Sequence, residues 1–225
     1  MVPGSDTDRV LAVRDLGRMG YGDALDLQFS MVESRRREEI PDTLLLVEHP
    51  PVITMGRKAS DQDILRSPDE LRAMGVEIHR VNRGGEATYH GPGQIVGYAI
   101  INLYAHQRRL RLFVERMEQV FISLLEAEYG IGAASDEEHR GVWVGNEKIT
   151  AIGIAVTRGI TMHGFAFNVN PDLTHFDWIV PCGIRDRGVT SLARLLGESP
   201  DIAKVKRQVI EHFVATYHYT PGTAE

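Results

Sequence analysis

Cysteine is almost missing from this sequence of 225 residues, in which Cys182 is the single example. One thiol can form neither an intrachain disulfide nor a cysteine-rich metal site, so any importance of Cys182 has to come from its own chemistry. The nine histidines include no His-Glu-x-x-His pair, the spacing that holds a hydrolytic zinc ion. We therefore expect no metal and no cofactor.

Other catalytic signatures and long apolar runs are missing as well. The chain has neither the Gly-x-Ser-x-Gly elbow of a serine hydrolase nor the P-loop lysine of a nucleotide-binding protein. Its longest apolar run, 95–105, is about half of the roughly 20 residues that cross a bilayer. The first residues, Met1 to Asp8, are polar and do not resemble a secretory signal. The sequence predicts a cytoplasmic protein without a membrane-spanning segment.

The charge balance is acidic, with a formal net charge of −6. An acidic chain seldom offers the broad basic face that binds phosphate backbones, so no nucleic-acid partner is expected. Two basic clusters, 35–37 and 108–109 with Arg111, are typical of solvated helix faces. Docking of an acidic partner is the alternative interpretation of these clusters.

Composition and periodicity predict one α/β (α+β) domain, residues 1–225, with a mixed sheet flanked by helices. Hydrophobic residues make up 43% and charged residues 25%, and no linker or repeat divides the chain. Residues 1–8 and 220–225 are expected to be frayed. The spacing of apolar residues predicts helices at 23–37, 110–129 and 191–196, and a last one from about 202 to 213, and a capping box formed by Ser67 and Glu70 predicts another at 67–75. Strands are predicted at 44–47, 52–55, 76–81, 95–103, 141–144, 149–156 and 160–167.

A loop rich in glycine, 83–94, joins two of the predicted strands. It holds four glycines and Pro92 together with Arg, Thr, Tyr, His and Gln side chains. Glycine lets a ligand approach backbone amides closely, and binding groups gather on loops that a rigid scaffold holds. A tight connection between strands is the simpler interpretation, and the polar side chains favour a binding loop.

Cys182 and Lys148 are the residues whose surroundings suggest reactivity. A lone cysteine is usually a small buried hydrophobe. Cys182, however, lies between a proline and a glycine, and Arg185 and Arg187 nearby favour a thiolate. Lys148 begins a strand that the pattern marks as buried, and a lysine removed from water gives up its proton more readily. A solvated hairpin lysine is the simpler alternative.

Three segments together resemble the octanoyltransferases of lipoate biosynthesis, over most of the chain from about Leu44 to Leu196. They are Arg83-Gly84-Gly85-x-x-Thr88-Tyr89-His90-x-x-Gly93-Gln94, the Lys-Ile-x-Ala-Ile-Gly run that begins at Lys148, and Pro181-Cys182-Gly183-Ile184. The resemblance implies the fold of biotin and lipoate protein ligases. It also implies transfer of an octanoyl group from octanoyl-acyl carrier protein to a lysine of a lipoyl domain, as found in 2-oxoacid dehydrogenases and in the glycine cleavage H protein.

The resemblance also implies residue functions. Cys182 would attack the thioester and hold the octanoyl group as an acyl-enzyme, and Lys148 would favour the thiolate and then take a proton from the acceptor lysine. The implied substrate-binding residues are Arg83, Gly84, Gly85, Glu86, Ala87, Thr88, Tyr89, His90, Ala151, Ile152, Gly153, Gly164, Phe165 and Ala166. Small residues among them leave room for a linear acyl chain, so Gly153→Leu is expected to block acylation without disturbing the fold.

Three alternatives stay open at this point. An ATP-dependent lipoate or biotin protein ligase would share the fold but needs no thiol. An amidotransferase that moves octanoyl between lipoyl proteins would use a cysteine too. A non-catalytic binding module would leave Cys182 inert. Because the proposed donor and acceptor proteins are acidic, Arg108, Arg109 and Arg111, or Arg185 and Arg187, are candidate docking residues.

Overall fold

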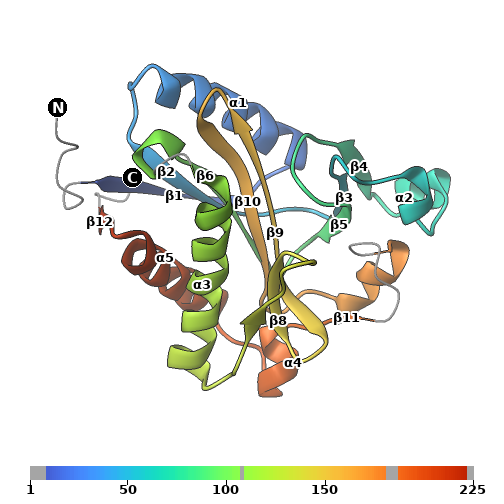
Figure 1. Ribbon diagram of the computed structural model, residues 1–225. Helices are drawn as coiled ribbons and strands as arrows, with labels where there is room; N and C mark the ends of the chain where they lie inside the picture. The colour runs from blue at the N-terminus through green and yellow to red at the C-terminus, as the bar shows by residue number, and fades with distance from the viewer. Residues whose placement is uncertain (1–8, 107–108, 181–186, 222–225) are drawn as a thin grey trace.

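One large sheet runs through the molecule, and helices cover both of its faces (Figure 1). The computed structural model describes residues 9–106, 109–180 and 187–221. Within them the sheet has nine strands. They are β1 (Val10–Arg18), β2 (Asp42–Glu48), β6 (Gln94–Ile100), β7 (Ala134–Ser135), β8 (Gly141–Val144), β9 (Glu147–Thr157), β10 (Ile160–Asn168), β11 (Gly188–Val189) and β12 (Thr220–Pro221).

The sheet is mixed, which confirms the predicted fold class. The strands lie in the order β12-β1-β2-β6-β10-β9-β8-β7, and β11 pairs with β9. The central pairs β2–β6, β6–β10, β10–β9 and β9–β8 are antiparallel, whereas β1 runs parallel to both β2 and β12. The central strands are buried on both sides, so their sequences are nearly continuous apolar runs.

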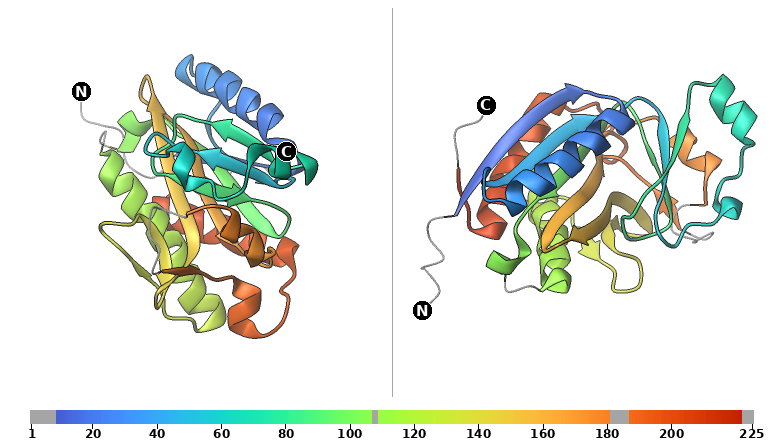
Figure 2. Two further views of the ribbon diagram at one scale, coloured as in Figure 1. Left: turned by 90° about the vertical axis from the view of Figure 1, so that its right-hand side faces the viewer. Right: turned by 90° about the horizontal axis from the view of Figure 1, so that it is seen from above.

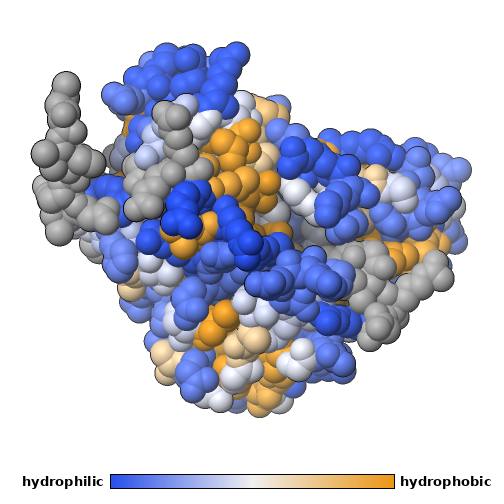
Figure 3. All heavy atoms as spheres, in the orientation of Figure 1, coloured by the Kyte–Doolittle hydropathy of each residue, from blue (hydrophilic) through white to orange (hydrophobic). Residues whose placement is uncertain are grey.

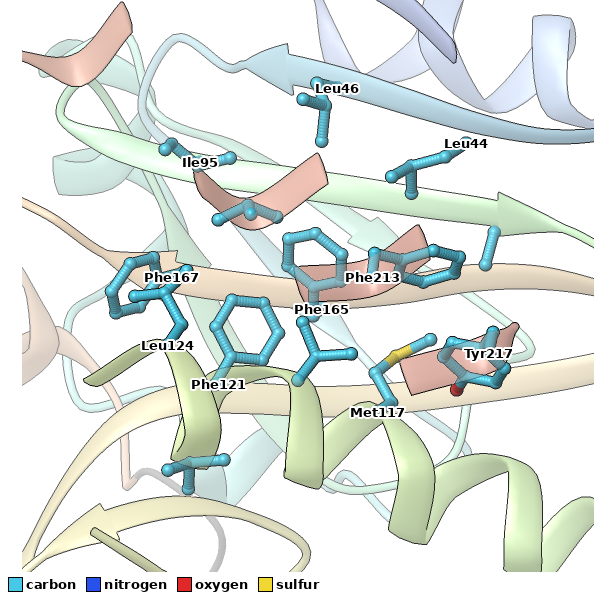
Figure 4. Close-up of a cluster of buried hydrophobic side chains, with 14 of the residues drawn as sticks. Leu44, Leu46, Ile95, Met117, Phe121, Leu124, Phe165, Phe167, Phe213 and Tyr217 are labelled. Atoms are coloured by element: carbon cyan, nitrogen blue, oxygen red, sulfur yellow. The ribbon is translucent and has the colours of Figure 1, made fainter. Parts of the chain in front are cut away.

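Two helices bury one face of the sheet and a third buries the other. Helices α3 (Leu110–Tyr129) and α5 (Ile202–Tyr217) pack against the face that includes Phe165 and Phe167 of β10 (Figure 4). The Phe121 ring lies 4.7 Å from Phe165 and 5.1 Å from Phe167, centroid to centroid. Helix α1 (Tyr21–Arg36) covers the opposite face, where it packs with Leu45 and Val47 of β2 and with Val96, Tyr98 and Ile100 of β6.

A small sheet projects from the side of the large one (Figure 2). Its strands are β4 (Glu77–Arg80), β3 (Val52–Met55) and β5 (Ala87–His90), with β3 in the middle. Helix α2 (Pro68–Ala73) begins with the predicted capping box: Glu70 N donates to Ser67 Oγ, and Ser67 N donates to Glu70 Oε2. Helix α4 (Leu192–Leu196) and the short helices η1 (Asp61–Asp63), η2 (Leu103–His106) and η3 (Leu173–Trp178) complete the fold.

The structure differs from the sequence-based expectation at several places. The strands β1, β7 and β11 were not predicted. Residues 87–90, expected within a loop, form β5 and pair with β3. The neighbouring strands β2 and β3 belong to different sheets. Thr220–Pro221, expected to be frayed, pair with β1, and Thr220 N donates to Arg9 O at 2.8 Å. Among the described residues, no helix is both long and apolar enough to cross a bilayer.

Candidate functional site

A cavity of about 310 Å³ lies where the segment 83–90 crosses β9 and β10. Pockets that bind small molecules begin at about this size. Of the residues predicted from the sequence, it is lined by Arg83, Gly84, Gly85, Glu86, Ala87, Thr88, His90, Lys148, Ala151, Ile152, Gly153, Gly164, Phe165 and Ala166. These residues come from three distant parts of the chain, and the fold brings them to one cavity.

Small side chains on paired strands make the floor of this cavity. In the β9–β10 register, Gly153 is opposite Gly164 and Ala151 is opposite Ala166. Because all four residues are small, the sheet has no bulky side chain here, and the segment 83–86 can lie against it. Gly84 N donates to the carbonyl oxygen of Ile154 at 3.2 Å, which ties the roof of the cavity to β9.

Gly153 is needed for this close approach. A Cβ atom at this position would lie 2.9 Å from the carbonyl oxygen of Gly84 and 3.2 Å from Cδ of Arg83. A larger side chain would therefore push the roof away from β9 as well as fill the cavity. That Gly153→Leu blocks acylation stays a prediction, but the variant would also displace the segment 83–86 and so would not test cavity filling alone; Ala151 offers a cleaner position.

Lys148 is buried at the start of β9, with only 7% of its surface exposed. Its Nζ donates to the carbonyl oxygen of Arg140 at 3.1 Å and lies 4.7 Å from the centre of the Trp143 ring. Gly141 lies beside it, because a Cβ atom there would be 3.3 Å from Lys148 Cε and 2.5 Å from the carbonyl oxygen of Thr150. These neighbours fix the amine where it borders the cavity.

Cys182 lies outside the described residues, as do Arg185 and Arg108. The described residues on either side of this stretch are hydrogen bonded to other parts of the fold. Val180 N donates to Asp63 O at 2.8 Å, and after residue 187 the strand β11 pairs with β9, with Val189 opposite Lys148. The segment that follows the predicted nucleophile in the sequence is thus hydrogen bonded to the segment that carries Lys148.

The cavity wall also has a polar part further along β9. Tyr21, His90, Tyr98 and His163 line it, and Tyr98 is opposite Gly164 in the β6–β10 register. Burial, together with the charge of Arg83, lowers the pKa of both His90 and His163 to about 3, so both rings are neutral at physiological pH. Burial likewise raises the pKa of Tyr21 to about 12.

His163 adopts a backbone conformation that non-glycine residues rarely use, with φ of 59°. Its amide donates to Oε1 of Gln28 on α1 at 2.9 Å, and its Nε2 donates to Oδ1 of Asn82 at 2.7 Å. A strained residue that the surrounding contacts hold in place is common at functional sites. One local signal in the sequence points to it, the small residue Gly164 directly after it in a strand.

One predicted residue points away, and several lining residues were not predicted. Tyr89 packs with Phe176 and Trp178 beneath the small sheet, and its hydroxyl lies 2.7 Å from Nδ1 of His175. β5 alternates the direction of its side chains, so Thr88 and His90 face the cavity and Tyr89 does not. Lining residues missed from the sequence are Tyr21, Arg57, Lys58, Val96, Tyr98, Leu110, Val114, Glu138, His139, Arg140, Ile154 and His163.

An apolar surface continues from the cavity toward the start of α3. Leu110 is 38% exposed, and Val114 and Ile152, which line the cavity with it, are half-buried. In the space-filling view, hydrophobic atoms appear near the middle of this face, with hydrophilic residues around them (Figure 3). Among the described residues, no three His, Cys, Asp or Glu side chains gather as metal ligands would. The cavity suits an apolar chain that ends near an amine.

The fold defines the class of the protein. A putative lipoate protein ligase from T. acidophilum with bound lipoic acid superposes with a TM-score of 0.71, covering 96% of this chain and 88% of that one, at 17% identity. The protein therefore has the fold of lipoate protein ligases.

Sequence comparisons give the family. The family model of the lipoyl protein ligase A/B catalytic domain matches residues 20–214. An octanoyltransferase from Caldicellulosiruptor saccharolyticus is 55% identical over 194 residues, covering 86% of this chain and 83% of the relative. Another from Desulforamulus reducens is 48% identical over 211 residues, covering 94% and 92%. The chain belongs to the lipoyl protein ligase A/B catalytic-domain family, and its resemblance to octanoyltransferases is confirmed.

Proposed function

We propose that this protein transfers an octanoyl group from octanoyl-acyl carrier protein to the acceptor lysine of lipoyl domains, in two steps. In the first step, Lys148 accepts the thiol proton of Cys182, and the thiolate attacks the thioester carbonyl of the donor. The carrier thiolate leaves and takes up that proton, so Cys182 becomes an octanoyl thioester. No ATP is consumed, because the donor is already activated.

In the second step the acceptor lysine attacks the acyl-enzyme. Its neutral amine displaces the Cys182 thiolate, an amide forms, and Lys148 takes the proton that the amine loses and returns it to the thiolate. The acceptors that fit this chemistry are lipoyl domains of 2-oxoacid dehydrogenases and the glycine cleavage H protein. The small-residue floor of the cavity would hold the octanoyl chain in both steps.

The observation that carries the proposal is the buried amine of Lys148 at the border of the cavity. A lysine with 7% exposure and a backbone acceptor at 3.1 Å is held in place rather than solvated. Further support comes from the pairing of Val189 with Lys148, seven residues after Cys182 in the sequence. The 48–55% identity to octanoyltransferases favours the transferase over the ligase alternative.

We further propose that Arg57 and Lys58 contact the anionic donor, octanoyl-acyl carrier protein. Both line the cavity with exposed side chains and, within the described residues, neither forms an ion pair. Backbone bonds hold them on the roof: Arg57 N donates to Arg83 O at 3.0 Å and Lys58 N to Gly85 O at 3.1 Å. Two candidates from the sequence are engaged elsewhere, since Arg111 bonds Glu115 and Arg187 bonds Asp136.

Intact mass spectrometry tests the reaction. The enzyme is incubated with octanoyl-loaded acyl carrier protein without ATP, and an apo lipoyl domain is added afterwards. We expect one octanoyl group on the enzyme, absent in Cys182→Ser, which then moves to the lipoyl domain. Acylation of the domain only from free octanoate and ATP would establish a ligase instead. Transfer only when an octanoylated lipoyl protein replaces the carrier would establish an amidotransferase.

A further inference from the structure

A chain of buried hydrogen bonds begins at the backbone of Lys148. Thr190 follows β11, and its amide donates to the carbonyl oxygen of Lys148 at 3.0 Å. The carbonyl oxygen of Thr190 accepts a bond of 3.0 Å from Nδ2 of Asn168, the last residue of β10. A carbonyl oxygen can only accept, so this contact fixes the orientation of the Asn168 amide, with Oδ1 pointing away from Thr190.

Gln94 connects Asn168 with His90 in this chain of hydrogen bonds. Its Nε2 donates to Oδ1 of Asn168 at 2.9 Å and to the carbonyl oxygen of Tyr89 at 3.1 Å. Since both of these partners accept, Oε1 of Gln94 is the atom that faces Nδ1 of His90, 3.0 Å away. His90 therefore carries its proton on Nδ1, and its Nε2 is left as an acceptor.

Thr54 and Arg83 complete the chain at the roof of the cavity. The Thr54 hydroxyl lies 3.4 Å from Nε2 of His90 and is free to donate to it, because Nε and Nη2 of Arg83 donate to the same oxygen at 3.2 and 2.9 Å. Nη1 of Arg83 also donates to the carbonyl oxygen of Gly84 at 3.0 Å. The hydrogen bonds all point one way, from Arg83 through Thr54, His90, Gln94 and Asn168 to Thr190.

The direction of these bonds gives the chain a single consistent state. Aligned hydrogen bonds in a low-dielectric interior polarise one another, and a buried member that loses its partner carries the full desolvation cost. Gln94 and Asn168 are 1% and 4% exposed, and neither lines the cavity. Their side chains therefore act on the residues at the two ends of the hydrogen-bond chain, and not on a ligand.

We propose that Gln94 and Asn168 are positioning residues: they hold the Arg83 roof of the acyl cavity in register with the strand end that carries Lys148. The proposal rests on the proposed function, because register matters most when an acyl group under the roof has to meet the amine. No proton moves along these hydrogen bonds in the proposal. The proposal requires His90 to keep a lone pair on Nε2, since a second proton there would break the bond from Thr54.

The surroundings of His90 favour this neutral ring. The groups that face it are Arg83, whose charge repels an imidazolium, the His163 ring, which is neutral, the His49 ring at 6.0 Å, whose pKa burial lowers, and the Tyr21 ring, which stacks at 6.1 Å. A carboxylate in place of the Gln94 amide would reverse this balance, because it would attract a protonated ring and could no longer donate to Asn168.

The test uses isosteric changes with matched controls. Gln94→Glu and Asn168→Asp each replace one NH2 of the chain by oxygen, and Gln62→Glu and Asn170→Asp make the same changes at exposed positions. For Gln94→Glu we expect the acylation rate per folded enzyme to fall about 10²-fold with the KM for the octanoyl carrier unchanged. Its pH–rate profile should gain an inflection near neutral pH. Asn168→Asp should slow acylation too, and the controls should not.

Nitrogen-15 NMR of His90 gives a readout that does not depend on activity. The wild-type ring should be protonated at Nδ1 alone, and the ring in Gln94→Glu at both nitrogens. Variants that lose thermal stability but keep the wild-type rate and pH profile would overturn the proposal, as would a wild-type ring protonated at Nε2. A wild-type protein with that Nδ1 tautomer but no transfer activity would refute the proposed function instead.

Discussion

Lys148 is the residue on which the proposed proton transfers depend most directly. Lys148→Arg replaces an amine that accepts and releases a proton in the proposed steps with a guanidinium, which stays protonated in proteins. We expect octanoyl transfer without ATP to fall about 10²- to 10⁴-fold. Lys204→Arg, on the exposed side of α5, should transfer at the wild-type rate. Equal rates for the two variants would remove Lys148 from the mechanism.

Ala151 tests whether the cavity holds the acyl chain. Its side chain lines the floor opposite Ala166. Ala151→Leu should reduce enzyme acylation by octanoyl carrier about 10- to 200-fold and by butanoyl carrier much less, because three more carbons occupy the inner space. The comparison is made on initial rates, with Ala203→Leu on the exposed surface of α5 as the control. Equal losses for both chain lengths would contradict a chain-binding floor.

Two neutral histidines make the fold sensitive to acid. In the unfolded chain a histidine takes up its proton near pH 6.5, whereas His90 and His163 stay neutral in the fold until about pH 3. Between these values the unfolded state binds more protons, so the free energy of unfolding falls as the pH falls, by up to about 1.4 kcal/mol per pH unit for each ring. Above pH 6.5 the two rings do not make the free energy of unfolding depend on pH.

Urea unfolding at pH 7, 6 and 5 checks this. His163→Gln should show a shallower fall in the free energy of unfolding than the wild type, because one proton-binding site is lost from the unfolded state. His218→Asn, an exposed position, should keep the wild-type slope. Comparing the slopes removes the contribution of titrating groups that all three proteins share, such as Glu118, whose pKa is raised by burial. Identical slopes would mean that His163 is not buried in its neutral form.

At the scale of elements, the contact of α3 with β10 anchors the helix. Phe121 is fully buried between Phe165 and Phe167, whereas Phe29 on α1 is 45% exposed. Phe121→Ala should lower the free energy of unfolding by about 3–5 kcal/mol, because it leaves a cavity in the core. Phe29→Ala should change it by about 0.5 kcal/mol or less. Denaturant titration of both variants measures the difference, and equal losses would contradict this packing.

Elements with a strong hydrophobic pattern could be predicted from the sequence. The stripe of α3 and the capping box of α2 are both found where they were expected. β1 was missed because most of its residues are exposed or half-buried and three of them are charged, so its sequence has no clean alternation. β5 was taken for loop because glycines surround its four residues, and its pairing with β3 is a contact between distant segments.

At the scale of the whole molecule, the site could be predicted only where a motif carries it. Segments around Arg83, Lys148 and Gly164 were found because each has a local pattern. Tyr21 joins the same cavity from α1 without such a pattern. The hydrogen bond from Gln94 to Asn168 joins residues that are 74 positions apart, so no rule based on sequence spacing predicts it. The direction of a side chain also decides whether a motif residue reaches the cavity. Tyr89 belongs to the motif but packs away from the cavity.

If the donor is the anionic octanoyl-acyl carrier protein of the proposed function, the charge of the whole molecule gives a prediction at the same scale. A protein with a net charge of −6 repels an anionic donor at long range, so the proposed function requires local cations near the cavity. The double variant Arg57→Ala/Lys58→Ala should raise the KM for octanoyl-acyl carrier protein several-fold with kcat unchanged. It should also flatten the rise of KM with salt between about 0.05 and 0.5 M, because screening acts on the charges that were removed.

Arg109→Ala/Arg111→Ala removes the same charge from the start of α3. Arg111 is bonded to Glu115 at 2.8 Å and lies 3.6 Å from Glu137, so its charge is already balanced and little change in KM is expected. Steady-state kinetics of both double variants over the salt series separate local docking from total charge. If both raise the KM equally, net charge governs the encounter. If only the α3 variant does, the donor approaches over α3, and Arg57 and Lys58 have no part in docking.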